Sequence, residues 1–246
     1  VQQIDAVAAD FLSFYPETLP VAPPSHPVYL VLGSRRGFCG DFNERLVLRV
    51  QRELAGAQAG HAAVIAVGHQ LCRRAETEID LAAALEGADV VEEIPSVLRA
   101  LVNELDARRD RQGPLSLQVL YHQAASAEPM LEQFLPPFQT HRGAPQPYTF
   151  APLLNLAPRD FLLELSGQYL FAALHALLFE SLLAENERRV RHLDGAVRHL
   201  EERVGTIQRR VRARRQEEII EEIEVILLNA LSLDQPATGA RAGEEV

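Results

Sequence analysis

The feature that most constrains the fold is the stretch from Pro158 to Pro236, which contains no proline between these two residues. Proline interrupts helices because it lacks a backbone N–H and its ring clashes with the preceding turn, so its absence permits a very long helix. Pro158 itself suits the first turn of a helix. We therefore expect a long helix over residues 158–233. We allow for a break near Gly167, because a glycine inside a helix costs about 1 kcal/mol.

Apolar residues in the second half of this stretch recur at steps of four and three residues. The resulting period of about 3.5 residues is typical of a coiled coil. Arg215 and Gln216 interrupt the repeat, which resumes at Ile219 and continues to Ala230. The predicted seam consists of Leu193, Val197, Leu200, Val204, Ile207, Val211, Ile219, Ile223 and Ile226. Such a seam needs a partner helix, because a lone helix would expose a continuous apolar stripe.

Charge is segregated along the same helix. Residues 188–215 are rich in arginine, whereas residues 217–224 read EEIIEEIE. One interpretation is a solvated face with pairs of opposite charge four residues apart. The alternative is a surface that contacts a partner of fixed shape.

The first half of the chain alternates apolar runs with helical patterns, which indicates a three-layer, Rossmann-like α/β domain with a mostly parallel sheet. We expect the end of a helix over residues 1–15, a proline-rich linker over 16–27, the α/β domain over 28–150 and a disordered tail over 234–246. The strands expected within the domain are 28–33, 62–68, 114–123, a short strand in 88–95 and an edge strand in 128–137. The expected helices are 42–54, 69–76 and 96–110, the last with Ser96 as its N-cap.

Composition excludes several classes of protein. The net charge of −10 argues against a nucleic-acid-binding protein. All 24 basic residues are arginine. Two cysteines do not make a disulfide scaffold. The chain opens without a secretory signal, and no apolar run approaches the roughly 20 residues that span a bilayer. We therefore expect a cytosolic protein or one peripheral to a membrane.

The sequence GSRRGFCGDFNERL, residues 33–46, leads from an apolar strand into a helix and resembles a phosphate-binding loop. A Walker-type loop needs a lysine, and the chain has none. The glycines of a dinucleotide site follow G-x-G-x-x-G, whereas here they are Gly33, Gly37 and Gly40. We interpret Gly37 and Gly40 as residues that permit tight backbone geometry. An enzyme that binds a nucleotide at the Gly37 loop remains an alternative.

The other candidate catalytic and metal-binding residues lack the partners that such sites need. Cys39 lies beside arginines near a helix start, a setting that lowers a thiol pKa, but no histidine is spaced to act as its base. We expect Cys39 to be a small buried residue. His69 and Cys72 lack the two further ligands of a zinc site. The residues thus predict no catalytic site, no metal site and no cofactor.

The same turn gives the clearest resemblance. Residues 34–43, SRRGFCGDFN, resemble the S-x-R-G-x-C-G-x-x-N signature of the ATP synthase gamma subunit, the rotor shaft of the F-type rotary ATPase. The matching residues are Ser34, Arg36, Gly37, Cys39, Gly40 and Asn43. Arg35 and Asp41 depart from the family pattern. Residues 119–136, 181–197 and 214–226 resemble further segments of the family in the same order, with Glu185 and Arg189 among the matches. The departures suggest a divergent or alternate-type complex.

The resemblance implies a non-catalytic central-stalk subunit that couples ion-driven ring rotation to conformational cycling of the catalytic sites. Its implied partners are the alpha and beta subunits of the catalytic head, an epsilon subunit and the membrane c-ring, with no nucleic acid and no direct nucleotide binding. Arg215 and Gln216 would contact the catalytic beta subunit. The implied location is the cytoplasmic face of a bacterial inner membrane. Family members also carry a long N-terminal helix, of which residues 1–15 would be the last turns. A coiled-coil adapter unrelated to ATP synthesis is the remaining alternative.

Overall fold

The computed structural model describes residues 1–19, 26–56, 62–124, 126, 128–142 and 149–233. The chain divides into two compact units, Val1–His192 and Leu193–Val246. The predicted disordered tail over 234–246 and the middle of the predicted linker, residues 20–25, lie outside the described residues.

A five-stranded sheet with the order β3-β2-β1-β4-β5 forms the centre of the first unit. Four strands run parallel, and β5 pairs antiparallel with β4 at the edge. The strands are β1 (His26–Leu32), β2 (Ala63–Val67), β3 (Ala83–Leu85), β4 (Leu115–Tyr121) and β5 (Met130–Leu135). In the central strand, Leu30 pairs with Ile65 on one side and with Val119 on the other. The predicted, mostly parallel sheet is therefore confirmed.

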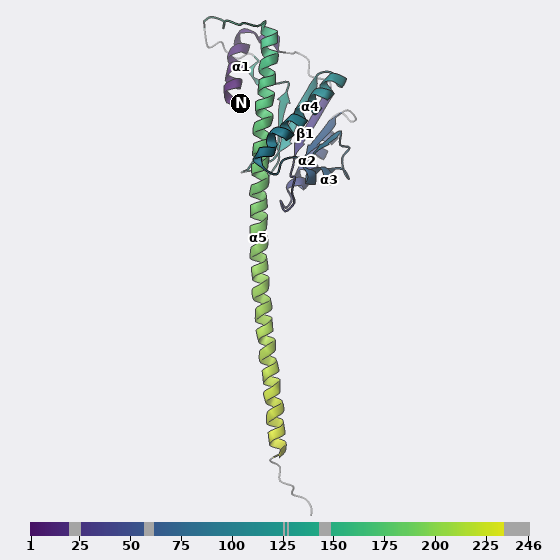
Figure 1. The fold of residues 1–246 in the computed structure, drawn as a ribbon, viewed down its shortest axis with the longest axis vertical. Helices are drawn as coiled ribbons and strands as arrows, with labels where there is room; N and C mark the ends of the chain where they lie inside the picture. The colour runs from purple at the N-terminus through teal and green to yellow at the C-terminus, as the bar shows by residue number, and fades with distance from the viewer. Residues whose placement is uncertain (20–25, 57–61, 125, 127, 143–148, 234–246) are drawn as a thin grey trace, which may run out of the picture. The chain divides into compact units, whose positions relative to one another are not determined.

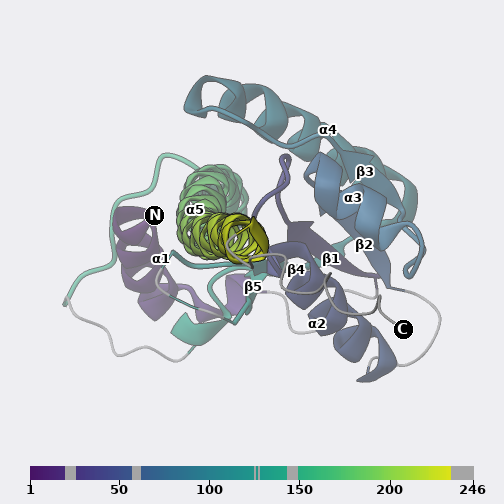
Figure 2. The same ribbon diagram turned by 90° about the horizontal axis from the view of Figure 1, so that it is seen from below.

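Helices cover both faces of this sheet, because β1 is apolar on both faces. Leu30 and Leu32 of β1 belong to a core shared with α4 (Ile94–Gln112) and part of α5 (Pro158–Leu233). Tyr29 and Val31, which alternate with them, belong to a core shared with α2 (Phe42–Gly56) and α3 (His69–Ala75). Figure 2 shows α4 and α2 on opposite sides of the sheet. The three-layer α/β architecture is thus confirmed.

The first helix, α1 (Gln2–Phe14), packs beside the first turns of α5 and runs antiparallel to them (Figure 1). The Phe11 ring lies 4.8 Å from the ring of Phe161 between centroids. This smaller core consists of Ala8, Phe11, Leu12, Leu19, Phe138 and Leu162. The remaining short elements are 3-10 turns at η1 (Pro16–Thr18), η2 (Val91–Glu93) and η3 (Gln139–His141).

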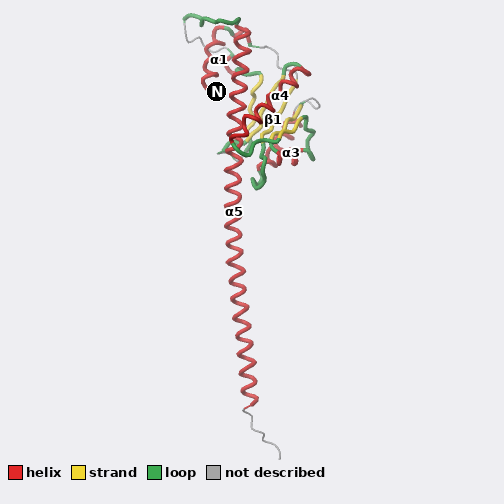
Figure 3. Tube along the Cα trace, in the orientation of Figure 1, coloured by secondary structure: helices red, strands yellow, loops and turns green. Residues whose placement is uncertain are grey.

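The last helix, α5, is continuous from Pro158 to Leu233, as Figure 3 shows. The expected break near Gly167 is therefore wrong. No atom lies within 4 Å of the position that a Cβ would take at Gly167, so no close packing bends the helix there. One 18-residue window of α5 reaches a mean hydropathy of 1.4, which meets the length and composition of a membrane span. Leu174, Leu177 and Leu178 of this helix are buried against the sheet.

Two local predictions before α4 are also wrong. The third parallel strand is Ala83–Leu85, whereas residues 91–93 of the expected strand in 88–95 form a 3-10 turn that leads into α4. The helix begins at Ile94 with Pro95 in its first turn, so Ser96 is not the N-cap. The Ser96 hydroxyl instead donates to the Glu93 carbonyl at 2.7 Å. Two glutamates and a proline favour the start of a helix here. This preference is stronger than the preference of the β-branched residues at 90 and 91 for a strand.

Candidate functional site

The signature turn begins where β1 enters close contact with β2 and α3. The Gly33 N–H donates to the Val67 carbonyl at 2.8 Å. A Cβ at Gly33 would lie 2.6 Å from Leu71 Cβ and 2.8 Å from Asn43 Oδ1. A side chain at this position would overlap Leu71 and Asn43, so the close packing favours glycine.

Ser34 and Asn43 close the turn through a pair of reciprocal hydrogen bonds. The Ser34 N–H donates to Asn43 Oδ1 at 3.0 Å, and Asn43 Nδ2 donates to Ser34 Oγ at 2.8 Å. Ser34 is fully buried. The first and last residues of the family signature thus fix the ends of the turn, and a buried polar pair satisfies itself there.

The tip of the turn holds two residues in left-handed backbone conformations. Gly40 has φ of 63°, which favours glycine. Phe38 also has φ of 63°, and its side chain is 71% exposed. Gly37 has an ordinary φ and open space around it, so the expected steric need for glycine at Gly37 is wrong. Sequence reasoning missed Phe38, because nothing in its neighbours signals a strained aromatic residue.

Glu185 of α5 binds the backbone of the turn. Its carboxylate accepts hydrogen bonds from the N–H groups of Arg35 and Arg36, each at 3.3 Å. Glu185 is 3% exposed and forms an ion pair with Arg189, one helical turn away. Burial raises the pKa of the Glu185 carboxyl, while Arg189 and the two backbone N–H groups act to lower it.

Arg189 continues the contact between the helix and the turn. Its Nε donates to the Gly37 carbonyl at 3.3 Å. Cys39 is buried beside it, as expected, and its thiol donates to the Arg36 carbonyl at 3.2 Å. Burial raises the pKa of Cys39, so the lowered pKa suggested by the nearby arginines is wrong. The two segments with family resemblance, the turn and residues 181–197, therefore meet in space.

The two positions that depart from the family pattern are both ion-paired. Arg35 Nη1 lies 2.6 Å from Glu93 Oε2, at the start of α4. Asp41 lies 2.6 Å from Arg45 Nε and 3.2 Å from Arg188 Nη1. The hydrogen bond from Arg45 lowers the pKa of Asp41. These departures connect the turn to α2, α4 and α5 through charged side chains.

His122, which follows β4, lies beneath the start of α2. Its Nε2 is 3.0 Å from the Phe42 carbonyl oxygen, and its ring centroid lies 4.2 Å from that of Phe42. The histidine is 1% exposed, and burial lowers its pKa. A neutral imidazole fits this position, because an imidazolium would lose its hydration there.

Arg215 and Gln216, the predicted contacts with the beta subunit, are adjacent exposed residues of α5 within the second unit. The nine predicted seam residues are likewise on α5, with exposures between 41% and 66%. Their predicted roles concern partners, so they remain predictions.

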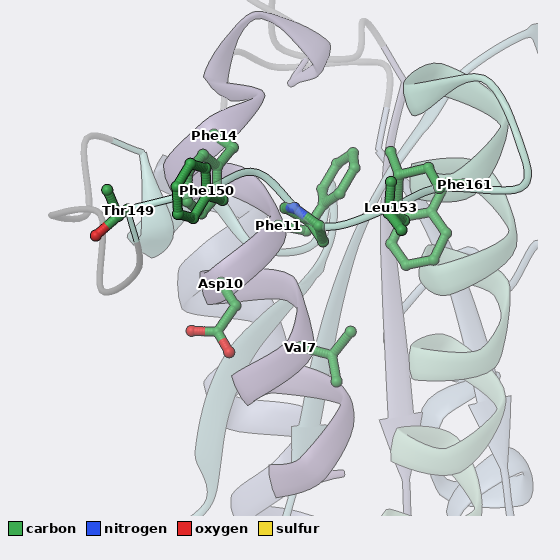
Figure 4. Close-up of a pocket in the computed structure, with 10 residues that line it drawn as sticks. Val7, Asp10, Phe11, Phe14, Thr149, Phe150, Leu153 and Phe161 are labelled. Atoms are coloured by element: carbon green, nitrogen blue, oxygen red, sulfur yellow. The ribbon is translucent and has the colours of Figure 1, made fainter.

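An apolar pocket of about 610 Å³ lies between α1, residues 149–154 and the start of α5 (Figure 4). Phe11 and Phe14 line it from α1, Phe150 and Leu153 from the connecting segment. Its chemistry is apolar, with the Asp10 carboxylate at the edge. Within the described part of the chain, no group of three or more His, Cys, Asp or Glu side chains is arranged to hold a metal ion.

The fold and the site define a protein in which the signature turn of an α/β domain is joined to one long helix, α5, by hydrogen bonds to Glu185 and Arg189. A family model described as ATP synthase matches residues 2–233. The chain belongs to this family, that of the ATP synthase gamma subunit, and is thereby a central-stalk subunit.

Solved structures agree at the level of the fold. A chain of the Tetrahymena thermophila mitochondrial ATP synthase central stalk and c-ring has a TM-score of 0.58 at 14% identity, covering 80% of this chain and 85% of its own. A chain of the Euglena gracilis mitochondrial ATP synthase has a TM-score of 0.58 at 15% identity, covering 100% of this chain and 93% of its own. No curated protein matches the chain.

Proposed function

We propose that this subunit is the non-catalytic rotor shaft of an F-type ATP synthase and that it couples ion-driven rotation of a membrane ring to conformational cycling of the catalytic sites. A shaft must resist twisting between the part that receives torque and the part that delivers it. The α/β domain would receive torque from the c-ring beside an epsilon subunit. The seam half of α5 would deliver it within a head of alpha and beta subunits.

The observation that carries this proposal is the contact of Glu185 and Arg189 with the turn at Arg35–Gly37. The contact joins α5 to the domain by directional hydrogen bonds to backbone atoms, 149 to 152 residues apart in the chain. Charge-assisted hydrogen bonds of this kind are stronger than neutral ones and fix orientation. Leu174 and Leu177 also pack against the sheet, but apolar packing is not directional. Without the hydrogen bonds to the turn, the helix would slide or rotate on the sheet more easily.

Arg215 and Gln216 are the proposed contacts with the beta subunit. Both are exposed, and the arginine offers a planar donor fork that matches a carboxylate. The proposed location is peripheral to a membrane, on the cytoplasmic face of a bacterial inner membrane. The packing of α1 against α5 at Phe11 and Phe161 supports the antiparallel pair of helices that the family resemblance implies.

The test is co-expression of the chain with the alpha and beta subunits of an F-type ATP synthase, followed by purification through the beta subunit. We expect the chain to co-purify and the complex to hydrolyse ATP, with rotation of a bead attached to the α/β domain. Arg215→Ala with Gln216→Ala should lower the rotary torque or the hydrolysis rate several-fold. Arg212→Ala, an exposed arginine on the same helix, is the matched control. ATP hydrolysis by the isolated chain, or failure to enter a head, would contradict the proposal.

A further inference from the structure

The apolar pocket beside α1 is a second site, separate from the contact between α5 and the signature turn. Its volume of about 610 Å³ lies within the range of pockets that hold small organic ligands. The walls come from the second half of α1, the connecting segment 149–154 and Phe161 of α5, all within the first unit. Figure 4 shows the connecting segment crossing α1 toward α5. Three segments of the chain therefore build this pocket together.

Phenylalanine rings form much of the lining. Phe11 and Phe14 come from α1, Phe150 from the connecting segment and Phe161 from α5. The Phe11 ring is held by neighbouring rings, with its centroid 4.8 Å from that of Phe161 and 5.0 Å from that of Tyr15. Phe150 is 84% exposed, so its ring is open to a ligand. The faces of aromatic rings carry partial negative charge and attract cations.

The charge at the pocket is also negative. Asp10 lines it, and within the described part of the chain no ion pair holds the Asp10 carboxylate. Asp5, on the same helix, is already paired with His141 at 2.8 Å. α1 and residues 149–157 contain no basic side chain. Arg159, at the start of α5, is exposed and is not one of the lining residues.

The rings and the carboxylate together select one class of ligand. Apolar rings alone would accept any apolar molecule, and a carboxylate alone would accept any cation. An anionic ligand would be repelled by Asp10, and a neutral one would gain only the burial of its apolar surface. An organic cation with an apolar body gains that burial, the attraction of the ring faces and a charged partner at Asp10.

We propose that the pocket between α1, residues 149–154 and Phe161 binds an alkyl- or arylammonium ion. The apolar body of the ligand lies on the phenylalanine rings, and its ammonium group lies at the Asp10 carboxylate. The rotor role needs no ligand at this pocket, so the site goes beyond that role and is tested on the full chain alone.

Three probes with the same decyl chain test the class of ligand. Titration calorimetry compares decyltrimethylammonium, decyl sulfate and decyl maltoside, each below its micelle concentration. The ammonium should bind with a stoichiometry of one and about tenfold more tightly than the anionic or the neutral probe. Equal affinities for the three probes, or no binding of the ammonium up to about 1 mM, would overturn the proposal.

The net charge of −10 attracts any cation, so a charge variant must localise the effect. Asp10→Asn should weaken binding of decyltrimethylammonium about fivefold and leave that of decyl maltoside unchanged. Asp80→Asn removes an exposed carboxylate outside the pocket and is the matched control, which should leave both affinities unchanged. An equal loss in the two variants would indicate attraction to the net charge and overturn the site.

Phe150→Leu tests the aromatic contribution, because it keeps an apolar side chain and removes the ring. Binding of decyltrimethylammonium should weaken about threefold, and that of decyl maltoside should stay within about twofold. Phe38→Leu, at the exposed phenylalanine of the signature turn, is the matched control and should change neither affinity. An equal loss of both probes in Phe150→Leu would show that the ring supplies apolar area only and would overturn the role of the rings.

Methyl NMR of the unmodified chain locates the ligand. Val7 and Leu153 line the pocket from α1 and from the connecting segment. Their methyl signals should shift together as decyltrimethylammonium is added, with the same midpoint as the calorimetric titration. Shifts confined to methyl groups outside the pocket would overturn the proposal.

Discussion

The Glu185 carboxylate lies 3.3 Å from the backbone N–H of Arg36, although 149 residues separate them in the chain. The contact joins the α/β domain to α5 through a main-chain donor, so it depends on the path of the turn rather than on a particular side chain. A buried carboxylate with an arginine and two N–H groups as partners is costly to disturb, because removing it leaves these donors unpaired.

Glu185→Ala should lower the free energy of unfolding by about 3 kcal/mol, since Arg189 and the two backbone N–H groups lose their acceptor. Equilibrium unfolding in urea measures the change. Glu187→Ala, which removes the exposed carboxylate that pairs with Arg191, is the control and should cost less than about 1 kcal/mol. Equal costs for the two variants would show that the turn contact contributes no more than a surface ion pair.

The pH dependence of stability should differ between the wild-type chain and Glu185→Gln. Burial raises the pKa of Glu185 above its ordinary value of 4.5, so the folded state binds this proton more tightly than the unfolded state. The stabilisation from protonation is complete below about pH 4.5 and is lost as pH rises through the raised pKa. The stability of wild type relative to Glu185→Gln, measured by urea unfolding from pH 4 to 8, should therefore fall as pH increases.

Asp41 should behave in the opposite sense. Arg45 lowers the pKa of Asp41 below its ordinary value of 3.8, so the stabilisation exists above that value and is lost as pH falls through the lowered pKa. Relative to Asp41→Asn, the wild-type chain should lose stability on acidification below about pH 4. Parallel pH profiles for the two variants would contradict one of the two assignments, and the shared sign would show which.

Gly33→Ala should destabilise the chain by about 1–3 kcal/mol or prevent folding, because the added methyl would overlap Leu71 and the Asn43 side chain. Gly37→Ala is the matched variant in the same turn. It should be neutral or slightly stabilising, since its surroundings are open and its φ is ordinary. Thermal unfolding of the two proteins, followed by circular dichroism, compares them directly. A greater loss at Gly37 would contradict the structure of the turn.

Phe38→Gly should raise the free energy of unfolding by about 1 kcal/mol, because the left-handed conformation strains a phenylalanine and not a glycine. The side chain is mostly exposed, so little packing is lost. Phe150→Gly removes a still more exposed aromatic side chain of the first unit, 84% against 71%, and provides the comparison. Urea unfolding measures both, and a loss of stability at Phe38 would show that its ring packs more than its exposure indicates.

The sequence by itself determined the order of the elements, the mostly parallel sheet and the family. Buried strands such as residues 28–33 are near-continuous apolar runs, and helices repeat every three to four residues, so local composition reports them. The family signature could also be recognised from the sequence, because its residues lie within ten consecutive positions. The sequence did not locate β3 within residues 83–85, since a three-residue strand has too little pattern to distinguish it from a loop.

The tertiary structure decided which residues of the signature turn are sterically constrained and which residues of α5 contact it. Gly33 rather than Gly37 bears the steric constraint, because Leu71 and Asn43 reach it only once β1, α2 and α3 have packed together. The Cys39 pKa moves upward rather than downward, because burial outweighs the neighbouring arginines. Glu185 and Arg189 acquire their role only where α5 crosses the turn. Contacts between residues about 150 positions apart depend on the path of the whole chain, and no local pattern encodes that path.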